Sequence, residues 1–348
     1  MRFSGIVQAV FVSLSFLGCT SALTYKGGDL SSLPIVEGAG VTFKDTNGAT
    51  GKLENILKTH GMNTVRIRLW TSGTYDLTFG LAMAKRVKAA GLNLVVGLHF
   101  SDTWADPGHQ AIPAGWGSTV SSLNSSIYTY TKSVVTAFIK QGTPIDILAL
   151  GNEINVGLLW PVGKGGTTAG WSAASQFLHS AKVGATDGGF KGKTMIQISN
   201  GWDLGVQQFF YNNIFIKGAL STSDIDILAV SFYPYYGTGA TAAALKSTLT
   251  TLINTYGKDI IVAETDWPAV ACSAALSASF AKTPAGQIAW QQSITTVLAA
   301  LPGSHGKGTL YWEPGWIGSA ALGSPCGDNL LFASNGTARS SVDIFKSM

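Results

Sequence analysis

A regular alternation of two kinds of segment constrains this 348-residue chain more than any other feature of its sequence. Short runs of apolar, β-branched residues each end in a loop that is rich in glycine, proline, aspartate or tryptophan. Between most of these runs apolar residues recur with a helical period, as at Phe79, Met83 and Val87. The runs begin at Ile35, Asn63, Asn93, Ile145, Thr194, Ile225, Asp259 and Gly308. We therefore expect strands followed by helices along most of the chain.

This alternation predicts a parallel sheet covered by helices, because parallel strands need crossover connections and are buried on both faces. Eight strand–helix units fit a closed barrel, so the predicted fold class is α/β, a single (β/α)8 TIM barrel. An open doubly wound sheet is the alternative, although no G-x-G-x-x-G follows the first expected strand. We expect residues 23–348 to form one domain, with 101–126 as a loop over the barrel mouth.

The N-terminus has the layout of a secretory signal peptide over residues 1–22. Arg2 precedes an apolar run from Ile6 to Leu17, and small residues end at Ala22. The run is too short to span a bilayer, which needs about 20 apolar residues. A lipid anchor on Cys19 is the alternative. We expect a secreted, extracellular protein without a membrane partner.

Composition narrows the class of ligand. The net charge is +4 and only 12% of residues are charged, without the lysine and arginine runs that follow nucleic-acid phosphates. Nucleic acid is therefore not an expected partner. Ten tryptophans, ten tyrosines and 42 glycines favour flat contact surfaces and tight loops.

Signal cleavage would leave two cysteines, Cys272 and Cys326, in a chain that enters an oxidising compartment. We expect them to form a disulfide, with two separate thiols as the alternative. Two triplets, Asn124-Ser-Ser and Asn335-Gly-Thr, are N-glycosylation acceptors in turn-like sequence.

The expected strand ends are unusually polar. A parallel barrel brings the carboxyl ends of its strands to one mouth, where such enzymes carry out their chemistry. Arg66 and Arg68 are two residues apart on one strand and therefore face the same way. The other polar or aromatic strand ends are His99, Asn152, Glu153, Tyr233, Glu264, Trp312 and Glu313.

Glu153 and Glu264 would face each other across this mouth, as glycosidic bond cleavage requires of its two carboxyl groups. Arg66 or Arg68 would hold Glu264 ionised, while burial and the charge of Glu264 would keep Glu153 protonated. The structural alternative for each glutamate is a salt bridge at a strand end.

Four motifs at these positions belong together: RIRLW at 66–70, HFSDTWADPGHQ at 99–110, GNE at 151–153 and AETDWP at 263–268. The set resembles the arabinogalactan endo-β-1,4-galactanases of glycoside hydrolase family 53, a clan A family of retaining enzymes. The resemblance runs through nearly the whole mature chain. It implies endo-acting hydrolysis of internal β-1,4-galactosidic bonds in pectic galactan. The expected partner is therefore this polysaccharide substrate.

The resemblance also implies residue roles. Glu153 would be the acid/base and Glu264 the nucleophile, while Asn152 would bond the sugar 2-hydroxyl and Tyr233 would orient the nucleophile. Further residues are expected to contact sugar or support the site: His99, Asp102, Trp104, Asp106, Trp312 and Trp316. Each of these could alternatively be structural, and Glu313 is expected to be a structural or rim residue.

Neither a metal nor a cofactor is expected. His109, His179 and His305 lack metal-like spacing, and Cys272 with Cys326 would join loops where some relatives carry calcium. A monomer is the default. Two other functions stay open: hydrolysis of another β-glycan such as mannan, cellulose or xylan, and a non-catalytic carbohydrate-binding barrel.

Overall fold

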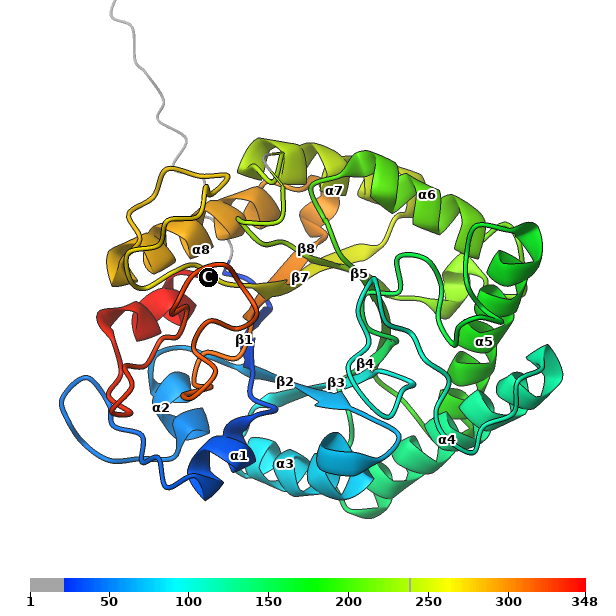
Figure 1. Ribbon diagram of the computed structural model, residues 1–348, viewed down its shortest axis with the longest axis horizontal. Helices are drawn as coiled ribbons and strands as arrows, with labels where there is room; N and C mark the ends of the chain where they lie inside the picture. The colour runs from blue at the N-terminus through cyan, green and yellow to red at the C-terminus, as the bar shows by residue number, and fades with distance from the viewer. Residues whose placement is uncertain (1–21, 238) are drawn as a thin grey trace, which may run out of the picture.

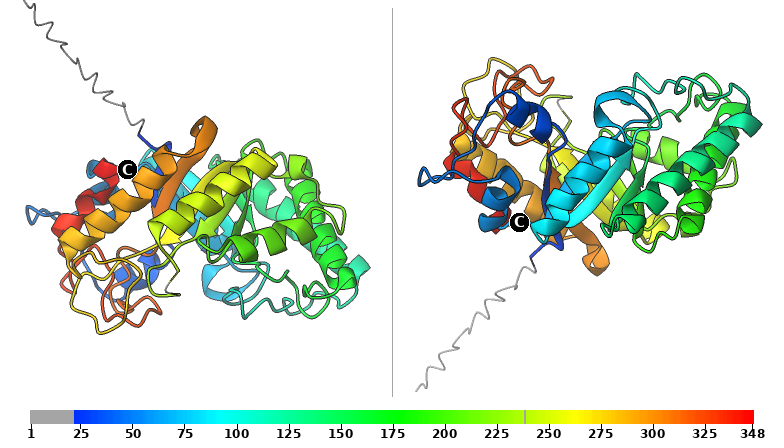
Figure 2. Two further views of the ribbon diagram at one scale, coloured as in Figure 1. Left: turned by 90° about the horizontal axis from the view of Figure 1, so that it is seen from above. Right: turned by 90° about the horizontal axis from the view of Figure 1, so that it is seen from below.

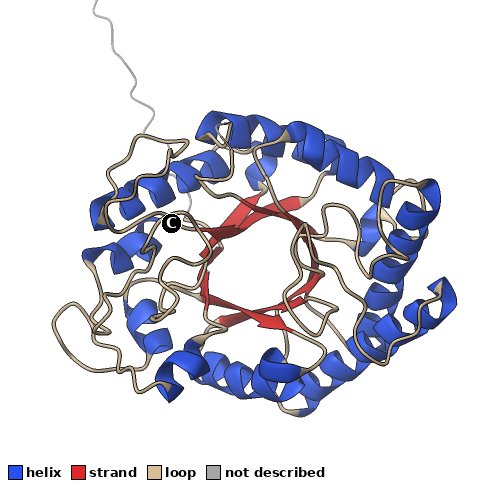
Figure 3. Ribbon diagram, in the orientation of Figure 1, coloured by secondary structure: helices blue, strands red, loops and turns tan. Residues whose placement is uncertain are grey.

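The computed structural model of the protein describes residues 22–237 and 239–348. Apart from Ala22, the predicted signal peptide and the alternative lipid site at Cys19 lie outside the described residues. Figure 1 shows a central ring of strands surrounded by helices, and Figure 3 separates the two layers by colour. The ring is a closed barrel in the order β1 to β8, and β1 pairs in parallel with both β2 and β8. This confirms the predicted α/β TIM barrel.

The elements alternate along the chain. The strands are β1 (Tyr25–Asp29), β2 (Thr64–Leu69), β3 (Asn93–Leu98), β4 (Ile147–Leu150), β5 (Lys193–Ile198), β6 (Ile227–Ser231), β7 (Asp259–Thr265) and β8 (Gly306–Tyr311). The helices are α1 (Leu33–Gly38), α2 (Leu53–Thr59), α3 (Leu77–Ala89), α4 (Val120–Lys140), α5 (Thr168–Asp187), α6 (Leu204–Ile214), α7 (Ala242–Tyr256) and α8 (Pro284–Ala299). A 3-10 helix at Ser340–Ser347 packs against α8.

One predicted strand is wrong. The run beginning at Ile35 enters α1 instead, whereas β1 is the glycine-rich segment Tyr25–Asp29. A Cβ atom on Gly27 would lie 2.4 Å from the carbonyl oxygen of Thr64 on β2, so the close approach of these strands requires glycine. The other seven predicted runs overlap β2 to β8, although β5 begins one residue and β8 two residues before the predicted start.

The expected loop over residues 101–126 is shorter than predicted. Helix α4 begins at Val120, where the Thr119 hydroxyl accepts a hydrogen bond from the backbone N–H of Ser122. The two side views in Figure 2 show the long connecting loops gathered at one end of the barrel. That end is where the strands finish, as a parallel barrel requires.

The barrel interior changes character along its axis. Its lower layers are apolar and include Val95, Ile147, Met195, Ile227 and Ile261. Side chains two positions apart on a strand face the same way, so the residues beyond these layers also point inward. On β5 the inward position after Met195 is Gln197, and on β2 the positions are Arg66 and Arg68. A packed apolar base therefore carries a polar upper layer.

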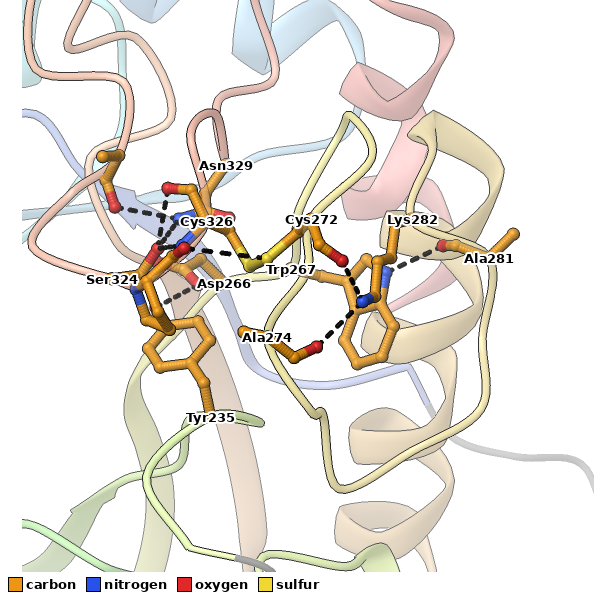
Figure 4. The surroundings of a disulfide bond; sticks show 12 residues. Tyr235, Asp266, Trp267, Cys272, Ala274, Ala281, Lys282, Ser324, Cys326 and Asn329 are labelled. Atoms are coloured by element: carbon orange, nitrogen blue, oxygen red, sulfur yellow. Dashed lines mark hydrogen bonds between the residues drawn. A yellow bond between two sulfur atoms is a disulfide. The ribbon is translucent and has the colours of Figure 1, made fainter.

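Cys272 and Cys326 form a disulfide, which joins the loop after β7 to the loop after β8 (Figure 4). The Lys282 ammonium donates hydrogen bonds to the carbonyl oxygens of Cys272 and Ala274 beside it. These contacts hold two long loops together above one side of the barrel.

The two predicted glycosylation sites differ in their surroundings. Asn335 is exposed in a turn. Asn124 lies in the second turn of α4, so its expected turn-like setting is wrong. Its side chain lies between helices, donating to Gln176 on α5 at 3.4 Å and accepting from Ser180 at 3.0 Å. A glycan on Asn124 would break these contacts.

Within the described part of the chain, no helix combines the length and apolar character that crossing a bilayer requires.

Replacing both cysteines, Cys272→Ser with Cys326→Ser, should lower the free energy of unfolding by about 2–4 kcal/mol, because the disulfide closes a loop of 54 residues in the unfolded chain. Urea denaturation followed by tryptophan fluorescence measures the change. Ser273→Ala, in the same loop, is the matched control and should unfold like the wild type. An unchanged midpoint in the double variant would contradict a stabilising role for the disulfide.

Candidate active site

The carboxyl ends of the strands surround a cleft of about 780 Å³. The predicted site residues that line it are Arg66, Arg68, His99, Trp104, Asp106, Asn152, Glu153, Tyr233, Glu264, Trp312 and Trp316. Further lining residues include Asn155, Ser199, Val206, Phe209, Ser231, Tyr236 and Leu322. Residues from both halves of the sequence therefore converge on one cavity.

Glu264, near the end of β7, is buried and receives three donors. Its Oε1 accepts from Arg66 Nη2 at 2.9 Å and from Gln197 Nε2 at 2.8 Å, and its Oε2 accepts from the Tyr233 hydroxyl at 2.9 Å. Burial beside Glu264 raises the pKa of Tyr233 far above its usual value, so this phenol remains a donor. All three neighbours therefore present hydrogen-bond donors to the Glu264 carboxyl oxygens.

Glu153 follows β4 with a left-handed backbone, φ 45°, two residues after Gly151 at φ 92°. Such a conformation is uncommon for a residue with a side chain and tends to mark functional sites. Burial and the nearby charge of Glu264 raise the pKa of Glu153 to about 8, opposed by hydrogen bonding to Ser231 and by Arg66. The two glutamates therefore have opposite environments: Glu264 is surrounded by donors, and Glu153 is kept protonated.

The two arginines, whose partners the sequence did not distinguish, contact different carboxylates in the structure. Arg66 reaches Glu264, and its other terminal nitrogen bonds Asp29 at 2.7 Å. Arg68 pairs instead with Glu313 at 2.6 Å and donates to the Tyr75 hydroxyl at 2.8 Å. Glu313 also accepts from the backbone N–H of Ser32, so it is a buried structural carboxylate.

Asn152 and His99 present donors to the cleft. Asn152 Oδ1 accepts from Arg66 at 2.6 Å and its Nδ2 donates to the Ala105 carbonyl at 2.7 Å, which leaves one N–H of the amide. His99 Nδ1 accepts from the Ala105 backbone at 3.2 Å, so its proton is on Nε2. Burial, together with Arg66 and Arg68, lowers the pKa of His99 well below its usual value, so the ring is neutral. Its buried Nε2 has no hydrogen-bond partner among the described residues.

Asp102, expected either to contact sugar or to support the site, makes its contacts within the loops beside the cleft. It is not among the described residues that line the cleft. Its carboxylate accepts from the Thr71 and Ser72 hydroxyls and from the Ala114 backbone at 2.6 Å, which braces the loop after β3. Asp106 does line the cleft, where it accepts from the Gly108 backbone at 2.7 Å.

Three tryptophans form one wall of the cleft. Trp104 and Trp316 are stacked with centroids 6.2 Å apart, and Trp312 meets both edge-on at 6.4 Å. The Arg68 guanidinium lies 4.5 Å from the Trp104 ring centre, beneath this wall. Aromatic faces fixed in this way suit the C–H face of a sugar ring.

Some site residues escaped the sequence analysis. Asp29 was missed because β1 was misplaced, although it is the carboxylate that pairs with Arg66. Gln197 and Ser231 could have been noticed as polar residues within otherwise apolar strands. Phe209 lies on α6 with its side chain half exposed, and no motif marks it.

Among residues 22–237 and 239–348, no group of histidine, cysteine, aspartate or glutamate side chains is arranged to hold a metal ion.

Comparisons with known proteins agree with this geometry. A probable arabinogalactan endo-beta-1,4-galactanase A of Neosartorya fischeri is 44% identical over 354 residues, covering 98% of this chain and 98% of the relative. The arabinogalactan endo-beta-1,4-galactanase of Thermothelomyces thermophilus is 43% identical over 338 residues, covering 93% and 99%.

Solved structures give the same result. A chain from a study of two fungal beta-1,4-galactanases matches with a TM-score of 0.91 and 42% identity, covering 94% of this chain and 100% of that chain. The Ignisphaera aggregans GH53 catalytic domain matches with a TM-score of 0.82 and 26% identity, covering 93% and 95%. The model of glycosyl hydrolase family 53 matches residues 25–345, nearly all of the described barrel. The chain therefore belongs to glycosyl hydrolase family 53.

Proposed function

We propose that this protein hydrolyses internal β-1,4-galactosidic bonds of pectic arabinogalactan, with retention of configuration at the anomeric carbon. The observation that carries the proposal is the pair Glu153 and Glu264 in one cleft, with opposite environments, in a family 53 barrel. The names of the relatives supply the substrate class.

In this proposal Glu264 is the nucleophile. Its carboxylate attacks the anomeric carbon and the bond to the leaving oxygen breaks, giving a covalent glycosyl-enzyme. Arg66, Gln197 and Tyr233 hold Glu264 in place through the contacts at 2.8–2.9 Å. Holding a nucleophile in its attacking geometry lowers the barrier, because less orientational freedom is lost on reaction.

Glu153 is the acid/base. It gives its proton to the leaving oxygen in the first step and takes a proton from water in the second, when water displaces Glu264. A buried carboxyl group beside another carboxylate retains its proton near neutral pH, as the first step needs. The remaining N–H of Asn152 is placed to bond the sugar 2-hydroxyl, and the three tryptophans offer stacking surfaces.

Residues 1–22 would direct the enzyme out of the cell, to a plant polysaccharide that is too large to enter it. We further infer that it acts as a monomer, because the catalytic and binding groups named above all come from one chain.

The substrate is tested by reducing-end release from linear β-1,4-galactan beside β-mannan, xylan and carboxymethyl cellulose. Galactan should be the preferred substrate. Glu264→Gln, which keeps the side-chain shape, should lower kcat by at least about 10³-fold because the nucleophile is lost. Activity on another glycan that also depends on Glu264 would show that the proposed substrate is wrong, while the proposed mechanism would still hold. Activity unaffected by Glu264→Gln would overturn the assigned nucleophile.

Azide rescue tests which glutamate has which role. In Glu264→Ala, azide should restore cleavage of an activated aryl galactoside and give the α-glycosyl azide, because it attacks directly from the vacated face. In Glu153→Ala, the same substrate should still form the glycosyl-enzyme, and azide should release the β-glycosyl azide. Product NMR distinguishes the two anomers. Exchanged products would reverse the two assignments.

The alkaline side of the pH profile should report Glu153. Its raised pKa means that the protonated acid persists through neutral pH, so kcat/KM should fall as pH rises through about 8. Burial also raises the pKa of Asp266 to about 8, so Asp266→Asn is the control and should retain the alkaline limb. If the alkaline limb disappears in Asp266→Asn, the limb reports Asp266 and our assignment of it to Glu153 is wrong.

A further inference from the structure

Two hydrogen bonds between a tyrosine and a carboxyl group lie side by side where the loop after β6 meets the end of β7. The Tyr233 hydroxyl donates to Glu264 Oε2 at 2.9 Å, and the Tyr235 hydroxyl donates to Asp266 Oδ1 at 2.5 Å. Figure 4 shows the second pair. The two tyrosine rings are stacked, with centroids 5.6 Å apart and planes at 23°. Only the first pair faces the cleft, because Tyr235 and Asp266 are not among the described residues that line it.

Asp266 is a carboxyl group in a place where an ion pair does not explain it. The residue is fully buried, and its only hydrogen-bond partner among the described residues is Tyr235. Its Oδ2 has no partner, and no described lysine, arginine or histidine forms an ion pair with it. Burial raises the pKa of Asp266 to about 8, opposed by the hydrogen bond from Tyr235. A buried carboxyl group without a cation generally destabilises a fold, so the contact with Tyr235 is what this side chain contributes.

The backbone on both sides of Asp266 is anchored. The Thr265 hydroxyl accepts a hydrogen bond from the Trp290 indole at 2.8 Å. The Trp267 carbonyl accepts one from the buried side chain of Gln287 at 2.9 Å. Asp266 is therefore a fixed acceptor, and the hydroxyl that donates to it is fixed in turn.

Tyr233 depends on its neighbours for its orientation. Among the described residues three aromatic rings contact it, and two of them, Tyr236 and Trp312, line the cleft themselves. The third is Tyr235, which lies against the face of the Tyr233 ring behind the cleft lining. Pro234 joins the two tyrosines and restricts the backbone between them. A displacement of the Tyr235 ring would therefore also displace Tyr233.

We propose that Asp266 and Tyr235 are positioning residues for the nucleophile. Asp266 fixes the Tyr235 hydroxyl, the Tyr235 ring supports the Tyr233 ring, and Tyr233 then donates to Glu264 in the orientation needed for attack. Neither Asp266 nor Tyr235 touches the substrate or exchanges a proton with it. A displaced donor leaves the Glu264 carboxylate freer to rotate away from the anomeric carbon, which lowers kcat more than substrate affinity. The inference rests on the proposed function for the role of Glu264.

Position 266 needs an acceptor oxygen, whether or not the carboxyl group is charged. Asp266→Asn keeps such an oxygen and should keep kcat on galactan within about twofold of the wild type. Asp266→Leu has a similar volume without an acceptor, so it should lower kcat by about 5–20-fold and change KM by less than about twofold. Equal losses in the two variants, or a loss confined to KM, would overturn the positioning role of Asp266.

Tyr235→Phe removes the hydroxyl and keeps the ring. It should lower kcat to about the same extent as Asp266→Leu, because both changes break the same hydrogen bond. Tyr128→Phe is the matched control: Tyr128 is also half-buried and donates to an aspartate, Asp187, at 2.7 Å, but it lies between α4 and α5. This control should retain the wild-type kcat. Equal losses in Tyr235→Phe and Tyr128→Phe would show that Tyr235 contributes only general stability.

A double-mutant cycle with Tyr233→Phe tests whether Tyr235 acts through Tyr233. Once the Tyr233 hydroxyl is gone, Tyr235 has no donor left to position. Adding Tyr235→Phe to Tyr233→Phe should therefore lower kcat by less than about twofold further, although the same change in the wild type lowers it by about 5–20-fold. Two losses that multiply in full would overturn the proposal, because residues that act independently have additive free-energy effects.

Crystal structures of the Asp266 variants give a measurement that needs no substrate. In Asp266→Asn the Tyr233 hydroxyl should stay within about 3.2 Å of Glu264 Oε2, and in Asp266→Leu it should move beyond about 3.5 Å. An unmoved Tyr233 hydroxyl in Asp266→Leu would overturn the inference even if kcat falls. A wild type that cleaves no galactan would instead contradict the proposed function, and the two crystal structures would still decide whether Asp266 positions Tyr233.

Discussion

The buried guanidinium of Arg66 is the interaction on which the site depends. It contacts Asp29 of β1, Asn152 after β4, Gln197 of β5 and Glu264 of β7, all between 2.6 and 3.1 Å. One side chain therefore joins residues from four places around the barrel. Losing one partner of a buried ion pair generally costs about 3–5 kcal/mol, so the fold and the catalytic geometry are stabilised by the same contacts.

Arg68 shows why two similar residues on one strand have different tasks. It lies two positions further along β2, towards the mouth, and pairs with Glu313 beneath the tryptophan wall. In the proposed mechanism Arg66 organises the nucleophile Glu264, whereas Arg68 supports the tryptophan wall proposed to hold the sugar. A planar group with five fixed donors suits both tasks, because each arginine has to satisfy several acceptors at once.

The sequence was sufficient for the parts of the fold that follow from apolar pattern. Seven of the strand runs and the helical periods of α2, α3, α4, α7 and α8 are visible there, because buried strands and amphipathic helices require them. The first strand was not visible, since close contact between backbones selects glycine at Gly27 and removes the apolar signal. Asp29 is the last residue of that strand and was therefore not predicted as a site residue. As a result, no partner on β1 was predicted for Arg66.

The site was predictable where residue type and strand end coincide, as for Glu153, Glu264 and Asn152. It was not predictable where the partner is set by geometry across the barrel. Nothing in the spacing of Arg66 and Arg68 distinguishes their partners, and Asp102 looks like a cleft residue until the loop after β3 is folded. The role of Gln197 follows only from its contacts with Arg66 and Glu264, which come from other strands of the barrel.

The disulfide has a consequence for where this protein can acquire its final shape. The segment from Trp316 to Cys326 supplies Trp316, Ser319, Leu322 and Gly323 to the cleft, and its end is bonded to Cys272 in the neighbouring loop. One wall of the substrate groove is thus completed by an oxidation reaction rather than by packing alone. The shape of the groove is therefore linked to the redox state of the compartment in which the chain folds. A barrel folded under reducing conditions would lack the covalent bond that holds this wall of the groove to the neighbouring loop.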